Sequence, residues 1–267
     1  MNALRIYGKR PYSVAVLHGG PGAPGGMAPV ARELSAEMGV IEPLQAAGTI
    51  DGQVAELAGV LEENADLPVT VIGWSWGATL GYIFAAYHPA LVKKLILVAA
   101  PPFEEEDTAA IFARRTQRLG EKERIEVFSL EETLWKSGGE ERRAAMARLF
   151  HLFAAADSFD SVSHPDEVLD YQFDINASVG LEVRQLTAGG GLLKLGAEIR
   201  CPVVAIHGDY DTHLPGDVKE PLARVLPDFR FILLEKCGHE PWAEKHAGEK
   251  FFRIVRKELG YGITGNK

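Results

Sequence analysis

Short apolar runs alternate with longer helical patterns along most of this chain, and that alternation restricts the folds open to it. Runs rich in valine, isoleucine and leucine are short enough to be buried strands, at residues 13–17, 39–41, 69–72, 95–98, 203–206 and 231–234. Helical patterns occupy residues 27–38, 50–65, 78–88, 216–226 and 242–259. Such alternation predicts an α/β fold, a mostly parallel sheet with helices on both faces. The ligand site of such a sheet forms beyond the carboxyl ends of its strands.

One long segment breaks this alternation. Residues 101–196 hold no run typical of a strand, and helical patterns follow one another there, at residues 107–119, 122–136, 140–156 and 164–187. Glycines at residues 138–139 and 189–191 separate some of these patterns. We therefore expect an inserted all-helical cap over residues 101–196. The two parts of the α/β core would then be residues 1–100 and residues 197–267.

A Gly-Trp-Ser-Trp-Gly motif at residues 73–77 directly follows one predicted strand and begins the next helix. A G-x-S-x-G motif at a strand–turn–helix junction is typical of a nucleophile elbow, in which the serine hydroxyl projects above the sheet. The glycines flank Ser75 because so sharp a turn leaves no room for Cβ atoms at the crossing. The alternative is a glycine-rich turn in which Ser75 only caps the helix.

A second glycine-rich loop, His-Gly-Gly-Pro-Gly at residues 18–22, follows the first predicted strand. Its backbone N–H groups can approach a substrate oxygen closely. We expect Gly19 or Gly20 to form an oxyanion hole together with the backbone N–H of Trp76. The alternative, a phosphate-binding loop, is disfavoured because no lysine follows and the G-x-G-x-x-G spacing is absent.

Two more strands end in polar loops, at residues 207–215 and 237–242. A serine is a poor nucleophile unless a base takes its proton, and the base needs a third group to fix its tautomer. We expect Ser75, His239 and Asp211 to be the nucleophile, the base and the orienting acid, in the chain order of the elbow motif. Asp209 is the alternative acid, but it directly follows the glycine at which the strand ends.

The remaining site expectations concern side chains near the reaction centre. His18, Trp74 and Trp76 are the expected substrate-binding residues, and His18 is also expected to support its own loop. The other histidines are not expected to be the base, because only His239 lies in the loop that follows the last predicted strand. His207 and His213 lie in the loop of the acid, and the rest lie on helices or their ends: His88, His151, His164 and His246. The aromatic residues of the cap are expected to form mainly its core, with some lining a substrate pocket.

Residues 18–22, 73–77, 208–215 and 238–239 resemble the oxyanion loop, nucleophile elbow, acid loop and histidine loop of the α/β-hydrolase superfamily. The resemblance implies an α/β-hydrolase fold. The H-G-G-P-G loop, with S-W-G at the elbow, is most similar to the proline iminopeptidase branch. Members of that branch cleave N-terminal proline from peptides and arylamides.

Several departures from that branch bear on the fold and the substrate. Only about 12 residues precede the first predicted strand, so we expect one or both early antiparallel strands to be missing. Residues 42–48 stand where relatives often carry D-x-R-G-x-G, and Trp74 stands where the branch typically has glycine. Iminopeptidases hold the substrate ammonium with cap carboxylates, and neither residues 104–107 nor Asp174 aligns with those.

The sequence therefore predicts a serine hydrolase that cleaves an ester or amide bond of a small, largely apolar substrate through an acyl-enzyme. Its activity should rise with pH through a pKa of about 6.5–7 as the histidine base becomes neutral. The alternatives are a proline iminopeptidase-type enzyme, a carbon–carbon hydrolase, lyase or acyltransferase on the same fold, and a non-enzymatic binding protein. We expect no cofactor and no metal.

Composition and charge narrow the class of protein. The net charge is −9 and the basic residues are scattered, so we expect a small-molecule substrate and no nucleic-acid partner. The absence of a run of 18 apolar residues predicts no membrane partner, and the first residues lack the apolar stretch of a signal peptide, so we expect a cytoplasmic protein.

Cys201 and Cys237 are predicted at opposite ends of the sheet, too far apart for a disulfide. The acidic run at residues 104–107 is interpreted as the first turn of a helix. The sequence makes no prediction of the oligomeric state.

Overall fold

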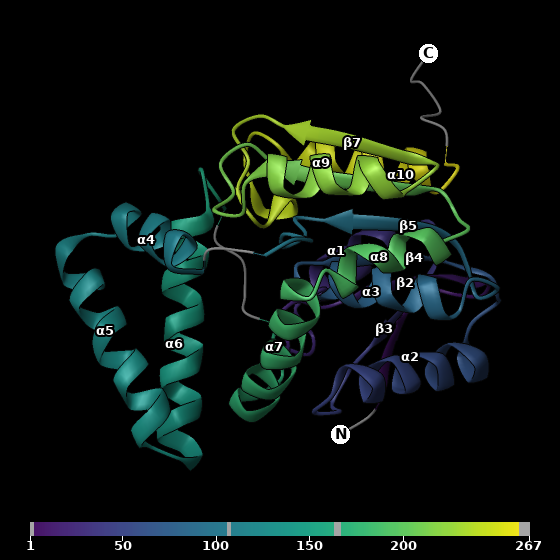
Figure 1. The fold of residues 1–267 in the computed structure, drawn as a ribbon. Helices are drawn as coiled ribbons and strands as arrows, with labels where there is room; N and C mark the ends of the chain where they lie inside the picture. The colour runs from purple at the N-terminus through teal and green to yellow at the C-terminus, as the bar shows by residue number, and fades with distance from the viewer. Residues whose placement is uncertain (1–2, 106–107, 163–166, 262–267) are drawn as a thin grey trace.

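A seven-stranded sheet runs through the molecule, with the strand order β1-β3-β2-β4-β5-β6-β7 (Figure 1). The structure is a computed structural model and describes residues 3–105, 108–162 and 167–261. The strands are β1 (Leu4–Tyr7), β2 (Tyr12–Leu17), β3 (Gly39–Pro43), β4 (Val69–Trp74), β5 (Val92–Val98), β6 (Val203–Gly208) and β7 (Phe229–Leu234). β1 is antiparallel to β3, and every other neighbouring pair is parallel. The prediction of an α/β fold with a mostly parallel sheet is confirmed.

Helices cover both faces of the sheet because successive residues of each strand point to opposite sides. Val14 and Val16 of β2 pack with helices α1 (Ala28–Leu34) and α10 (Gly248–Glu258). Ala15 and Leu17 face the other way. They belong to the larger apolar cluster, which takes in α2 (Ile50–Asn64), α3 (Trp76–Tyr87) and α9 (Pro215–Val225). The central strands are therefore buried on both faces, which is why they appear in the sequence as continuous apolar runs.

One early antiparallel strand is present, and its short sequence gives little sign of it. β1 pairs with β3 from Leu4 to Tyr7, and polar side chains add to this pairing: the Tyr7 hydroxyl donates to Glu42 Oε2 at 2.8 Å, and Arg5 lies 3.7 Å from the same oxygen. Glu42 is fully buried on β3, and its other oxygen accepts the Met27 N–H at 3.1 Å. Burial and the carboxylate raise the pKa of Tyr7 to about 12. Glu42, a departure from the family pattern, thus joins β1 to β3 and to the start of α1.

The segment expected to be one helix over residues 242–259 is in fact two elements. A short 3-10 helix, η2 (Pro241–Ala243), is followed by an irregular stretch before α10 begins. Glu244 lies in that stretch and forms an isolated antiparallel bridge with Ser161 of the cap segment. A residue paired with a distant part of the chain cannot continue the helix, and the apolar periodicity of the sequence does not reveal this interruption.

The inserted segment contains helices α4 (Thr108–Arg118), α5 (Glu121–Lys136), α6 (Gly139–Asp157), α7 (Phe173–Ala188) and α8 (Gly191–Lys194), with the 3-10 helix η1 (Leu195–Glu198). Figure 1 shows α4, α5 and α6 standing apart from the sheet, with α7 between them and the core. Residues of α5 and α6 form an apolar cluster of their own. Val179 of α7 and Leu192 of α8 instead belong to the main core cluster. A separate cap over residues 101–196 remains a prediction, and its last part packs as core.

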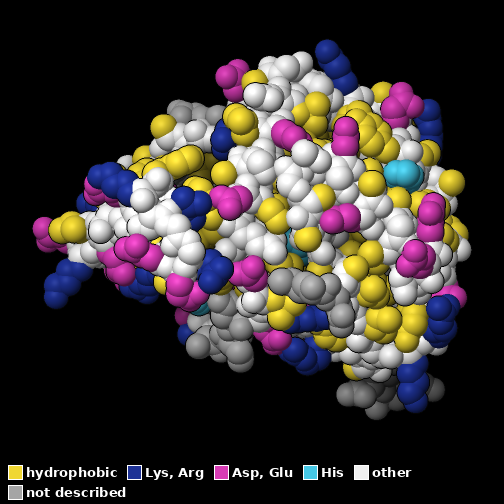
Figure 2. Space-filling view, turned by 90° about the horizontal axis from the view of Figure 1, so that it is seen from below, with side chains coloured by type: hydrophobic (Ala, Val, Ile, Leu, Met, Phe, Trp, Pro, Cys, Tyr) yellow, Lys and Arg dark blue, Asp and Glu magenta, His cyan; other side chains and the backbone are white. Residues whose placement is uncertain are grey.

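Further expectations concern the cysteines and the surface. Cys201 and Cys237 are both free thiols. No helix among the described residues is long and apolar enough to cross a bilayer. Figure 2 shows acidic and basic side chains interspersed over one face of the molecule. Glu104 and Glu105 precede α4 and are not helical, so the prediction that they belong to the first turn of a helix is wrong. The rest of the acidic run, Glu106 and Asp107, and the histidine His164 lie outside the described residues.

Candidate active site

Ser75 sits on a sharp turn between β4 and α3. Its φ of 52° and ψ of −120° place it in a backbone region that non-glycine residues rarely adopt. A Cβ on Gly73 would lie 2.0 Å from the carbonyl oxygen of Gly77, and a Cβ on Gly77 would lie 2.2 Å from that of Leu17. Both flanking positions therefore require glycine. The Ser75 side chain makes no capping hydrogen bond to α3, which disfavours a merely capping role.

The glycine-rich loop after β2 passes directly beside this turn. A Cβ on Gly19 would lie 2.7 Å from the Trp74 ring and 3.3 Å from the Ser75 Cβ. Gly20 has a φ of +116°, which favours glycine, and it lines the same cavity as Ser75. Trp76 is the first residue of α3, so its N–H has no intrahelical acceptor. These N–H groups remain the predicted oxyanion hole.

Asp211 and His239 lie in neighbouring loops and are hydrogen bonded to each other. His239 Nδ1 lies 2.8 Å from Asp211 Oδ2. Because an ionised carboxylate only accepts hydrogen bonds, Nδ1 carries the proton, and in the neutral ring the lone pair is on Nε2. Asp209 is engaged elsewhere, since its carboxylate accepts the Cys237 N–H at 3.2 Å. The geometry therefore pairs His239 with Asp211 and not with Asp209.

The two groups shift each other's protonation. Burial alone would raise the pKa of Asp211, but the charge of His239 and hydrogen bonds from His213 and His239 hold it well below its usual range. Burial alone would lower the pKa of His239, but the charge of Asp211 and its hydrogen bond raise it above the usual value. Asp211 therefore stays ionised at neutral pH, and His239 titrates above an ordinary histidine.

Trp74 and the end of the cap hold the backbone of His239 in place. The Trp74 indole N–H donates to the His239 carbonyl at 2.9 Å, and the two rings lie 5.5 Å apart. The His239 N–H donates to the carbonyl of Asp157, the last residue of α6, at 3.0 Å. Trp74 was expected to bind substrate. It does line the cavity, and it also supports the histidine.

Glu244 supports the predicted histidine loop, and sequence reasoning missed it. Its fully buried carboxylate accepts four hydrogen bonds, one of them from the Gly238 N–H at 2.9 Å. The other donors belong to the cap segment: the N–H groups of Phe159 and Asp160, at 2.7 and 2.8 Å, and the Ser158 hydroxyl at 3.3 Å. Glu244 thus joins the histidine loop to the residues that follow α6. A single glutamate in a polar stretch gives no sequence signal of this role.

A cavity of about 510 Å³ lies between the core and the inserted helices. Its volume is in the range of small-molecule sites. Ser75 and His239 both line it from the core side. Aromatic side chains line it from the cap side: Trp135, Phe150, Phe153 and Phe173. Phe150, Phe153 and Phe173 also pack against the apolar cluster of the inserted helices, as do Phe112 and Tyr171, which do not line the cavity.

Charged side chains also reach this cavity. Arg115 and Asp157 form an ion pair at 2.7 Å, and the Thr212 hydroxyl donates to Asp157 at 2.6 Å. Glu131 and Arg184 line the cavity farther along α5 and α7. Nothing in the sequence pattern singled out these groups, because they come from separate helices that only the fold brings together.

Two other residues predicted to bind substrate occupy different positions. His18 is fully buried, and its Nδ1 donates to the Gly19 carbonyl at 2.8 Å. Burial lowers the pKa of His18 to about 4, and its side chain is not part of the cavity wall, so it fits the role of loop support. Trp76 lines the cavity, and its indole N–H donates to Gln53 at 3.0 Å.

One group of described residues has ligand atoms close enough together to hold a metal ion, namely Asp211, His213 and His239, with atoms within 4.8 Å of one another. Hydrogen bonds among the three already account for this closeness. The absence of a metal remains a prediction.

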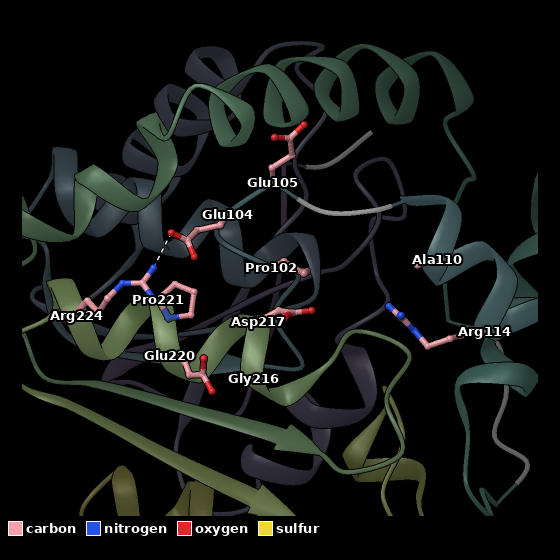
Figure 3. Close-up of a pocket in the computed structure, with 10 residues that line it drawn as sticks. All are labelled: Pro102, Glu104, Glu105, Ala110, Arg114, Gly216, Asp217, Glu220, Pro221 and Arg224. Atoms are coloured by element: carbon pink, nitrogen blue, oxygen red, sulfur yellow. Dashed lines mark hydrogen bonds and ion pairs between the residues drawn. The ribbon is translucent and has the colours of Figure 1, made fainter.

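A second cavity, of about 220 Å³, lies between the start of the inserted segment and α9. Figure 3 shows its exposed carboxylates, with Glu104 paired to Arg224 and Arg114 on the opposite side. The Arg114 side chain donates to the Thr212 carbonyl at 2.7 Å and thereby buttresses the loop that carries Asp211. Ser75 and His239 do not line this cavity, so the first cavity is the candidate active site.

Comparison with known proteins places this geometry in context. The sequence matches the model of the alpha/beta hydrolase family over residues 14–254. It is 26% identical over 209 residues to the pimeloyl-[acyl-carrier protein] methyl ester esterase of Chromobacterium violaceum, covering 76% of this chain and 74% of that protein. It is 24% identical over 217 residues to 2-hydroxymuconate semialdehyde hydrolase of Pseudomonas putida, covering 77% and 67%. The crystal structure of the proline iminopeptidase of Mycobacterium smegmatis is similar, with a TM-score of 0.63, 20% identity, and coverage of 96% of this chain and 93% of that one.

Proposed function

This chain belongs to the alpha/beta hydrolase family and is a hydrolase, and we propose that it cleaves an ester or amide bond with a serine nucleophile. The observation that carries the proposal is the 2.8 Å hydrogen bond between Asp211 and His239 beside the cavity that Ser75 also lines. These residues supply a nucleophile, a base and an orienting acid at one site.

In the proposed reaction, His239 Nε2 takes the hydroxyl proton of Ser75 as Oγ attacks the substrate carbonyl carbon. The N–H groups of Trp76 and of Gly19 or Gly20 stabilise the oxyanion. The tetrahedral intermediate collapses to an acyl-enzyme, and His239 returns the proton to the leaving group. Water then attacks the acyl-enzyme with His239 as the base, which releases the acid and restores Ser75.

The proposed substrate is a small ester with a largely apolar acyl part. The cap side of the cavity is lined by aromatic rings and by Leu134, Met146 and Leu149, which suits an aliphatic or ring-bearing acyl group. The esterase relative from Chromobacterium violaceum is named for the hydrolysis of a methyl ester. The second point favours an ester over an amide.

Glu131 favours a second candidate, an aminopeptidase of the proline iminopeptidase type. This carboxylate lines the cavity, is partly buried, and forms no ion pair with another residue that the structure describes. Burial raises the pKa of Glu131. A protonated substrate amine beside it would stabilise the ionised carboxylate.

The experiment that tests the proposal is labelling with a fluorophosphonate, which reacts only with an activated serine. We expect a single adduct on Ser75 by mass spectrometry, lost in Ser75→Ala and retained in Ser129→Ala, which changes an exposed serine on α5. Folded protein that takes no adduct would refute the proposal and favour a binding protein.

Substrate screening then separates the candidates. Turnover of p-nitrophenyl esters without turnover of proline arylamide supports the esterase, and preferential cleavage of proline arylamide supports the aminopeptidase. An adduct on Ser75 with turnover of neither substrate points instead to a carbon–carbon hydrolase or an acyltransferase, since the fold and the triad do not fix the bond that is broken.

A further inference from the structure

Asp211 is bonded to more than one histidine. Its Oδ2 faces His239, whereas its Oδ1 accepts the backbone N–H of His213 at 2.9 Å and lies 3.1 Å from His213 Nδ1. The His213 ring lies 5.0 Å from the His239 ring and lines the same cavity. His213, two residues after Asp211, is thus hydrogen bonded to one carboxylate oxygen, and His239 is hydrogen bonded to the other.

The tautomers of these rings follow from their acceptors. His213 Nδ1 faces an ionised carboxylate, so it carries a proton and donates it. His207 Nε2 donates to the His213 carbonyl at 2.9 Å, because a carbonyl oxygen can only accept. His207 Nε2 also lies 3.5 Å from Asp211 Oδ2. The backbone and the ring of His213 are therefore both fixed, and the ring is held toward Asp211.

The surroundings keep His213 uncharged. Burial lowers the pKa of His213, and the charges of His239 and Arg115 lower it further, against the raising effect of Asp211. Arg115 lies on α4 and is paired with Asp157, and the carboxylate-bearing residue Glu240, next to His239 in the chain, also lines the cavity. Burial also lowers the pKa of His207. One carboxylate thus faces one histidine that gains a proton during catalysis and two that remain neutral.

We propose that His213 is a positioning residue: its neutral Nδ1–H holds Oδ1 of Asp211 and thereby aims Oδ2 at His239. The proposal rests on the proposed function. A fully buried carboxylate needs donors on both oxygens to stay ionised in one orientation. His239 donates to Oδ2, and His213 supplies two donors to Oδ1, its backbone N–H and its ring Nδ1–H.

This role predicts a direction for the pH profile. A hydrogen bond donated to Oδ1 withdraws part of the negative charge that stabilises protonated His239. Removing that donor strengthens the attraction of Asp211 for the His239 proton. The acidic limb of kcat/KM therefore moves to higher pH when the His213 ring is lost, whereas a change in packing alone would leave the limb where it is.

The test compares two substitutions of nearly equal size. His213→Leu removes the donor, and His213→Asn keeps an N–H near the position of Nδ1 without a group that titrates. We expect His213→Leu to lower kcat about tenfold, the scale of one hydrogen bond to a buried charge. We expect its acidic limb to rise by about 0.5–1 pH unit, and His213→Asn to restore most of both effects.

A control away from the cavity is His88→Leu, which removes a histidine at the end of α3 that does not line the cavity. It should leave both kcat and the acidic limb in place. The proposal is overturned if His213→Leu leaves the limb unmoved or if His213→Asn behaves like His213→Leu. If His213→Leu does not fold, His213→Asn alone tests the proposal. An acidic limb of kcat/KM at the same pH as in the wild type supports the positioning role, and a limb at higher pH refutes it.

A direct titration separates this proposal from the proposed function. With ¹⁵N-labelled histidine, NMR reports the tautomer of His213 and the pKa of His239 without any turnover. We expect a neutral Nδ1–H tautomer for His213 and a higher His239 pKa in His213→Leu than in wild type. If these shifts are present but no fluorophosphonate adduct forms, the hydrolase chemistry fails and the positioning role stands. If the fluorophosphonate adduct forms but these NMR shifts are absent, only the role of His213 is refuted.

Discussion

The two walls of the cavity are built differently. On the core side, the His239 side chain is hydrogen bonded to Asp211 at 2.8 Å, and its backbone is held by Trp74 at 2.9 Å and by Asp157 at 3.0 Å. On the cap side, aromatic and aliphatic side chains of α5, α6 and α7 make up much of the wall, together with the charged groups Arg115, Glu131, Asp157 and Arg184. The core wall thus holds the proposed base in a fixed position, and the cap wall shapes the space beside it. Substitutions on the two walls should therefore affect different kinetic constants.

The largest effect should come from the core wall, at the nucleophile. Ser75→Ala should lower kcat by at least about 10⁴-fold, because no acyl-enzyme can form. It should change the free energy of unfolding by no more than about 1 kcal/mol, since the serine side chain makes no capping bond to α3. Ester turnover and thermal melting measure the two quantities. Substantial residual turnover would show that another group carries the reaction.

Next in size is the acid, where the two aspartates of one loop can be compared. Asp211→Asn should cost about 10³–10⁴-fold in kcat, because the amide would favour the wrong tautomer of His239. Asp209→Asn should cost less than about tenfold, because Asp209 only accepts the Cys237 N–H. Steady-state kinetics of both variants measure the difference. The assignment of the acid is wrong if Asp209→Asn is the more damaging change.

A smaller effect is expected on the cap wall. Phe150→Ala should raise KM for p-nitrophenyl octanoate by about tenfold, because the apolar acyl chain loses contact area. It should leave the kinetics of p-nitrophenyl acetate nearly unchanged, since a short acyl group stays near Ser75. A matching loss of kcat for both esters would contradict the division between the two walls.

The smallest effect is a displacement of the pH profile. Because the pKa of His239 is raised, its protonated form persists to higher pH than that of an ordinary histidine. Protonated His239 cannot accept the Ser75 proton, so kcat/KM should fall as the pH drops and be half-maximal above about pH 6.5. A profile that is flat between about pH 5 and 8 would exclude a histidine base.

The sequence predicted the core wall far better than the cap wall. The elbow at Ser75, the loop after β2 and the pairing of Asp211 with His239 follow from motifs at the ends of apolar strands, where parallel-sheet geometry brings loops together. Glycine spacing at the elbow is visible in the sequence because only glycine fits there. These features depend on backbone geometry at the ends of strands, and short sequence motifs are typical of that geometry.

Other features depend on contacts between distant segments, and the sequence does not show them. The strand β1 was missed because its stabilising group, Glu42, lies on another strand. Glu244 interrupts the predicted last helix in order to bind the cap segment, and Arg115 meets Asp157 only through the packing of α4 on α6. Contacts between residues far apart in the chain produce no periodic pattern in the sequence, so they become apparent only in the fold.

Glu244 makes the end of α6 and the histidine loop a single mechanical unit. The same carboxylate binds Gly238 on one side and Phe159 and Asp160 on the other, and Asp157 binds the His239 backbone directly. The end of α6 therefore cannot move away from the core without breaking these bonds or displacing His239. Any movement of α4, α5 and α6 relative to the core must hinge elsewhere, and we expect an exchange of this segment with that of a relative to preserve the site only if residues 157–160 and Glu244 stay together.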